Sequence, residues 1–221
     1  MRLIPALDEM GPEHLHGQFA FGIETNLSGT PAMDKLWEYI SNAKENPKSH
    51  NTELAGNIFS SLVLNDTDNW FFDNTCIPII GKYKEFFKKT TAFNSQSISK
   101  NDLPYGLSNF WVNFQKQHEF NPLHNHGGIW SFVVWVKIPT DFREQHALPF
   151  SANSNMARAS DFEFQYTTML GDITGSNYVL DKKSEGAMLF FPAKLLHSVY
   201  PFYECDKERV SISGNIHFET Q

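Results

Sequence analysis

The stretch "NPLHNHGGIWSFVVWVKIP", from Asn121 to Pro139, sets the pattern for the second half of the chain. Two histidines, His124 and His126, are followed at once by a nearly unbroken apolar run. Side chains two residues apart in a strand point to the same face. If one strand continues through the stretch, a single face carries both histidines and then only apolar residues from Trp130 to Ile138. We therefore expect inward histidines near one end of this strand, unless the glycine pair after His126 shifts the register.

Composition excludes several classes of protein. The chain has 221 residues, of which 41% are hydrophobic and 19% are charged, so it can bury a core and is neither disordered nor fibrous. A formal net charge of -7 without a basic cluster argues against nucleic acid or an anionic membrane as partner. No apolar stretch is long enough for a signal peptide or a membrane span, and two cysteines are too few for a disulfide framework. These features predict a cytoplasmic protein.

The first hundred residues mix helices and strands. The segment between Pro31 and Pro47 repeats apolar residues at helical spacing, and a second helix is expected from about Ile77 to Thr90. Strand patterns occupy residues 18–24 and 55–64. We expect residues 1–100 to form a mixed, largely helical support region.

Short strands separated by turn residues dominate the rest of the chain. This arrangement is typical of a β-sandwich or barrel. We expect a mainly β (α+β) protein, a double-stranded β-helix or jelly roll over residues 108–219, braced by the N-terminal helices. No change in composition marks a boundary, so residues 1–221 are predicted to form a single domain. The polar segment 140–160 is expected to be a long loop, either a lid over a site or plain surface.

Two inward histidines are costly unless something satisfies them, and a transition-metal ion is an economical partner for neutral imidazole. His197 is a candidate third ligand, because it follows an apolar strand and a turn and begins the next strand. Each signal has an ordinary explanation as well. A histidine pair such as His124 and His126 is more often exposed or hydrogen-bonded to protein, and His197 by itself fits a turn cap.

The last strand alternates sharply. Arg209, Ser211, Ser213 and Asn215 share one face, and apolar residues fill the other. An arginine and a serine two residues apart can clamp a carboxylate from two sides. The alternative is that this polar face is exposed to solvent on an edge strand. Asn113 presents the same choice, between a functional role and an ordinary polar position on an edge strand.

These residues together resemble the iron(II)/2-oxoglutarate-dependent oxygenases, and more narrowly the type common in bacteriophage genomes. The resemblance runs from about Phe110 to Phe218 and joins the His-x-His pair, the distal histidine and the Arg-x-Ser pair. It implies iron(II) bound by His124, His126 and His197, with 2-oxoglutarate as cosubstrate. The wider superfamily has a carboxylate where this chain has His126. Because the resemblance is to the type found in bacteriophage genomes, one expected source of the protein is a virus. Such a protein would act in the host cytoplasm.

The resemblance implies that Arg209 and Ser211 anchor the far carboxylate of 2-oxoglutarate, with Asn113 as a further contact. The expected activity is hydroxylation of a small-molecule or peptide substrate, with release of succinate and CO2. Two alternatives stay open at this point. One is a three-histidine cupin-type dioxygenase that needs no 2-oxo acid, and the other is a metal-free jelly-roll binding or structural module. The oligomeric state is not predicted.

Overall fold

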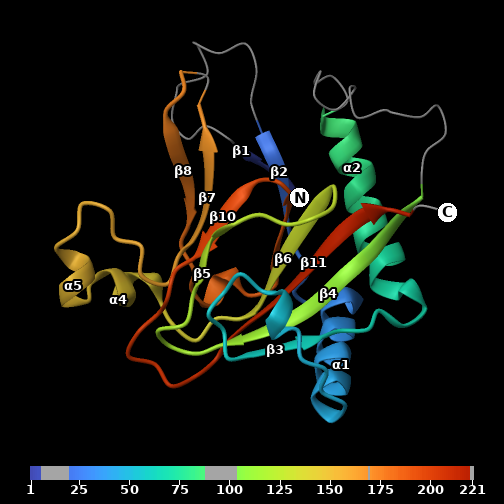
Figure 1. The fold of residues 1–221 in the computed structure, drawn as a ribbon, viewed down its shortest axis with the longest axis horizontal. Helices are drawn as coiled ribbons and strands as arrows, with labels where there is room; N and C mark the ends of the chain where they lie inside the picture. Colours follow the sequence, from blue (N-terminus) through green and yellow to red (C-terminus); the bar gives the residue numbers. More distant parts are fainter. Residues whose placement is uncertain (6–19, 88–103, 169, 220–221) are drawn as a thin grey trace.

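The computed structural model describes residues 1–5, 20–87, 104–168 and 170–219, which form two β-sheets and flanking helices (Figure 1). The strands are β1 Arg2–Pro5, β2 Ala20–Asn26, β3 Ser60–Val63, β4 Tyr105–Gln115, β5 Asn121–His124, β6 Trp130–Lys137, β7 Phe162–Thr167, β8 Ile173–Tyr178, β9 Ala187–Pro192, β10 Leu196–Val199 and β11 Arg209–Phe218. The principal helices are α1 Pro31–Glu45, α2 Ile77–Phe87, α4 Phe142–His146 and α5 Pro149–Ala152.

The sheets have seven and four strands, in the orders β1-β2-β9-β6-β11-β4-β3 and β5-β10-β7-β8. Every strand pair is antiparallel. From β4 onward the chain passes back and forth between the two sheets, so their inner faces enclose a shared interior. This topology confirms the predicted jelly roll.

The helices α1 and α2 cover the outer face of the seven-stranded sheet (Figure 1). Leu36 and Ile40 of α1 and Ile80 of α2 are buried in one cluster with apolar residues of β4, β6 and β11. The helix α1 begins at Pro31 and ends before Pro47, as the sequence predicts, because proline fits the first turn of a helix but not its interior. The predicted end of α2 at Thr90 lies outside the described residues, as do the first two residues of the predicted strand 18–24.

The N-terminal region also supplies strands to the larger sheet. The pair β1–β2 extends the sheet beyond β9, and β3 pairs with β4 at the opposite edge. The first hundred residues therefore contribute sheet as well as helix, while the single-domain organisation remains a prediction. Among the described residues, no helix combines the length and the apolar character that crossing a membrane would require.

One expectation about the opening stretch is wrong. The two histidines and the apolar run do not form one strand, since His124 ends β5 in the smaller sheet and β6 lies in the larger sheet. Gly128 allows the chain to change sheets, because its φ of 88° is disfavoured for other residues and Ile216 O lies 2.6 Å from where a Cβ would be. The even-numbered residues of β6 consequently face α1 and α2 instead of sharing the direction of the histidines.

Candidate metal centre

Three histidines from two segments of the chain meet at one end of the interior. His124 is the last residue of β5, His197 is the second residue of β10, and the two are direct partners across these strands. His126 lies two residues beyond β5 and is fixed there by a hydrogen bond from its backbone N–H to Ala193 O, 2.8 Å. One potential ligand atom from each ring lies within 4.8 Å of the other two. The predicted convergence of the three rings is confirmed.

Backbone carbonyl groups orient two of the rings. His124 Nδ1 lies 2.7 Å from Pro122 O, and His197 Nδ1 lies 2.9 Å from Leu195 O. A carbonyl oxygen only accepts, so Nδ1 carries the proton in each ring and Nε2 is left with its lone pair. Such an outer hydrogen bond fixes the tautomer of a metal-binding histidine. His126 Nε2 lies 3.0 Å from His197 Nε2, which suits two adjacent ligands with bonds of about 2 Å to one ion.

Burial keeps the three rings neutral at physiological pH. Loss of solvent, together with the neighbouring His124 and Lys194, lowers the pKa of His126 to about 4, against an opposing hydrogen bond to Asn215. Burial also lowers the pKa of His124 and, to a greater degree, that of His197. Neutral imidazole is the form that binds metal ions, so few protons compete for these nitrogens at pH 7.

Trp111 and Asn215 hold His126 from the larger sheet. The indole of Trp111 stacks on the His126 ring with centroids 5.6 Å apart and an interplanar angle of 15°. Asn215 Oδ1 accepts a hydrogen bond of 2.6 Å from Ser131 Oγ, which fixes the amide. Sequence reasoning missed Trp111, although it lies two residues before Asn113 on the same alternating strand and so had a recognisable signal.

A cavity of about 200 Å³ extends from the histidines between the two sheets. Asn113 and Ser211, which are register partners on β4 and β11, line its polar wall. Phe162 and Val199 of the smaller sheet line the opposite wall. Asn113 Oδ1 is buried without a hydrogen-bond partner, which is uncommon for a buried amide. Both residues therefore face the interior, and neither is a solvent-exposed edge residue.

Arg209 lies one step further along the inward face of β11 and is fully buried. Its Nη2 donates to Ser160 O at 2.8 Å and to Ser160 Oγ at 2.5 Å. Nη1 makes only long contacts of 3.5 Å to Gln115 Oε1 and Tyr200 O, and Nε has no partner. Arg209 is not among the residues that line the cavity, so its predicted place at a carboxylate-sized gap stays a prediction.

The electrostatic environment of Arg209 is unusual. Burial lowers its pKa to about 9, and Asp161 opposes that effect only in part. Within the described part of the chain, no carboxylate forms an ion pair with this guanidinium. A buried charge normally has an opposite partner, because desolvation is costly.

The segment 140–160 differs from the long, patternless loop that the sequence suggests. It contains α4 and α5, and Ser160 at its end is fully buried against Arg209. Nothing in the local sequence signals this contact, since it joins residues that lie 49 positions apart.

A jelly roll with three convergent histidines at one end of its interior is a fold with a candidate site for a metal ion. Residues 109–215 match the model of the family described as "Putative 2OG-Fe(II) oxygenase". Over this region the chain is similar to 2-oxoglutarate- and iron(II)-dependent oxygenases. The matched region runs from inside β4 to inside β11, and it includes all three histidines and Arg209.

The comparison with solved structures finds several similar ones at low identity. One is a viral collagen prolyl hydroxylase from Paramecium bursaria Chlorella virus-1 in complex with 2OG, with 14% identity, a TM-score of 0.49 and coverage of 89% of this chain and 95% of that chain. Another is a Pseudomonas putida prolyl-4-hydroxylase, with 12% identity, a TM-score of 0.46 and coverage of 90% and 93%. No curated protein matches the sequence.

Proposed function

We propose that His124, His126 and His197 bind iron(II) and that Arg209, Ser211 and Asn113 bind 2-oxoglutarate in this oxygenase. The observation that carries the proposal is the convergence of three histidine ligand atoms within 4.8 Å at one end of the cavity between the two sheets. The donor set fits the ion, since neutral imidazoles suit first-row transition metals and three ligands leave positions for other groups.

The absence of a carboxylate from this ligand set has an electrostatic consequence. Neutral imidazoles leave the full charge of a divalent ion uncompensated, whereas an aspartate in place of His126 would cancel part of it. A dianionic cosubstrate offsets that charge when it binds. We therefore expect 2-oxoglutarate and iron to strengthen each other's binding in this protein.

The polar end of the interior suits the far carboxylate of 2-oxoglutarate. Arg209 is buried and charged, with an unpartnered Nε and only long contacts at Nη1. Those donors remain open to a carboxylate, and Ser211 together with the unpartnered Asn113 amide adds hydrogen-bonding capacity nearby. The C1 carboxylate and ketone would then lie toward the histidines.

When bound, iron(II) and 2-oxoglutarate supply the activation of O2. The overall reaction converts a substrate C–H bond, O2 and 2-oxoglutarate into an alcohol, succinate and CO2. The protein orients the cosubstrate through Arg209 and Ser211 and keeps bulk water away with the walls of the cavity, which include Trp135, Phe162 and Val199. The substrate is a small molecule or a peptide, and the protein acts in the cytoplasm.

The decisive test is anaerobic titration of iron(II) into the protein, with and without 2-oxoglutarate. We expect a metal-to-ligand charge-transfer band in the visible region only when both are present, followed by succinate formation after O2 is admitted. Iron binding without this band would favour a three-histidine dioxygenase that uses no 2-oxo acid. Failure to bind iron at all would leave a metal-free binding module.

A further inference from the structure

Ser160 has an unusual backbone in a fully buried position. Its φ is 75°, in the left-handed region that residues other than glycine rarely occupy, and its side chain has no exposed surface. Its backbone N–H donates to Pro201 O at 2.8 Å. A strained buried residue persists only when its surroundings hold it in place, and such residues gather at functional sites.

The strained conformation presents two acceptors to one nitrogen. Both the carbonyl oxygen and the hydroxyl oxygen of Ser160 accept from Arg209 Nη2. Ser160 Oγ also lies 3.1 Å from Thr140 Oγ1, and either hydroxyl can be the donor of that hydrogen bond. Nη2 is thereby fully engaged, and the remaining donors, Nε and Nη1, are left for another acceptor.

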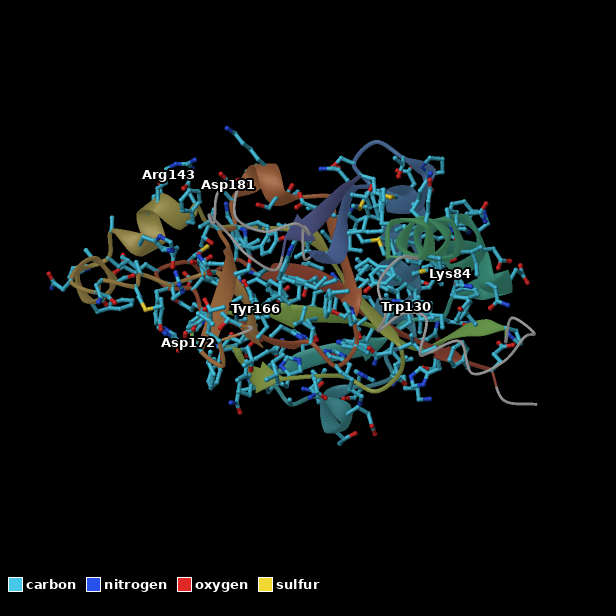
Figure 2. All side chains as sticks on the ribbon, turned by 90° about the horizontal axis from the view of Figure 1, so that it is seen from above. Lys84, Trp130, Arg143, Tyr166, Asp172 and Asp181 are labelled. Atoms are coloured by element: carbon cyan, nitrogen blue, oxygen red, sulfur yellow. The ribbon has the colours of Figure 1, made fainter. Side chains whose placement is uncertain are left out.

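The neighbouring residue, Asp161, connects this segment to other parts of the molecule through hydrogen bonds. Asp161 is fully buried and accepts from Asn177 Nδ2 at 2.7 Å, and both of its carboxylate oxygens lie 3.0 Å from His146 Nε2 on α4. At the surface, Arg143 of α4 and Asp181 lie side by side, with Nη1 and Oδ2 3.3 Å apart (Figure 2). The segment that carries Ser160 is therefore attached to the smaller sheet and to the loop before β9.

We propose that Ser160 is a positioning residue that orients the Arg209 guanidinium toward the far carboxylate of 2-oxoglutarate. The inference rests on the proposed function and deepens it. Two hydrogen bonds from Nη2 to Ser160 prevent the guanidinium from rotating. Its open donors therefore point in a fixed direction before the cosubstrate binds. Preorganisation of this kind removes part of the ordering cost from binding.

The test compares two ligands that differ in the far carboxylate. 2-Oxoglutarate and pyruvate are titrated separately into the anaerobic iron-loaded protein, and both dissociation constants are measured for parent and variants. Ser160→Ala removes the hydroxyl while the backbone carbonyl remains. Ser160→Gly removes the same hydroxyl and tolerates the positive φ, so it serves if the alanine variant does not fold. Ser151→Ala is the matched control, since Ser151 is a buried serine of the same segment.

We expect Ser160→Ala to weaken 2-oxoglutarate binding about tenfold, the size expected for one hydrogen bond to a charged group. Pyruvate and iron affinities should match the parent, and the substitution should have no further effect in an Arg209→Ala background. Unchanged 2-oxoglutarate affinity, or equal weakening for both ligands, would overturn the positioning role and leave the proposed function intact. A parent protein that binds no 2-oxoglutarate would remove both.

Discussion

The two faces of β11 differ in what they contact: the outward one packs against the helices α1 and α2, and the inward one faces the cavity and Ser160. The outward set is Val210, Ile212 and Ile216, and the inward set is Arg209, Ser211, Ser213 and Asn215. Both faces are largely buried, so burial alone does not distinguish them.

The difference between the faces lies in what each contact requires. Apolar side chains need only close packing, and the aromatic and aliphatic groups under the helices supply it. Polar groups inside a protein need partners, yet Asn113 Oδ1 and Arg209 Nε have none among the described residues. These two atoms lie on the inward side of β4 and β11, which is the side where we propose that the cosubstrate binds. Substitutions on the two faces should separate ligand affinity from folding.

The largest effect is expected at the metal. His197→Ala should weaken iron(II) binding by more than about 100-fold. Loss of a hydrogen bond that orients a metal ligand already weakens metal binding by about 10–100-fold, and loss of the ligand itself should have a larger effect. The measurement is an anaerobic iron titration, with thermal melting to verify the fold. His118→Asn is the control, since His118 is exposed and asparagine tolerates its positive φ. Equal iron affinity in His197→Ala and the parent would refute the metal site.

The next effect is expected at the buried guanidinium. Arg209→Ala should weaken 2-oxoglutarate binding by roughly 30-fold or more, the usual result of truncating one side of a buried charge pair. Arg209→Lys should recover only part of the loss, because an ammonium group cannot reproduce the guanidinium fork. Isothermal titration of the iron-loaded protein measures both variants. Parent-like affinity in the alanine variant would favour a dioxygenase that uses no 2-oxo acid.

A smaller effect is expected at His126, where the superfamily has a carboxylate. His126→Asp should keep iron binding, because it restores the more usual ligand set, whereas His126→Ala should weaken it by roughly tenfold or more. Competition with a coloured chelator gives the two affinities relative to the parent. The same affinity in all three proteins would mean that His126 is not a ligand.

The smallest effect tests the outward face. Ile212 has no exposed surface, and Ile212→Val should lower the free energy of unfolding by about 0.5–1.5 kcal/mol through the loss of one buried methylene. Urea unfolding measures this change. The affinity for 2-oxoglutarate should stay at the parent value. A clear loss of affinity in this variant would contradict the separation between the two faces.

Much of the fold was predictable because local sequence patterns report local geometry. Alternation over β11 correctly separates Ser211 from Ile212, and the proline that opens α1 correctly marks the start of that helix. The pattern failed at the glycine pair after His126, where the chain crosses between sheets. Alternation holds only inside one strand, so it cannot report where a strand ends when apolar residues continue beyond it.

The candidate site was predictable in its members and less so in its geometry. The sequence nominated His124, His126 and His197, and the structure brings them together. It also nominated Arg209, but nothing local indicates that Ser160 engages its guanidinium.

By itself, the sequence determined the jelly-roll class, the inward face of β11 and the set of histidines, because each depends on periodicity or on residue type. Only the tertiary structure decided which of these side chains meet. His126 and His197 lie 71 positions apart, and Ser160 and Arg209 lie 49 positions apart. Contacts of this kind depend on how strands from two sheets are placed against each other, and that placement follows from packing of the whole interior, which no short stretch of sequence encodes.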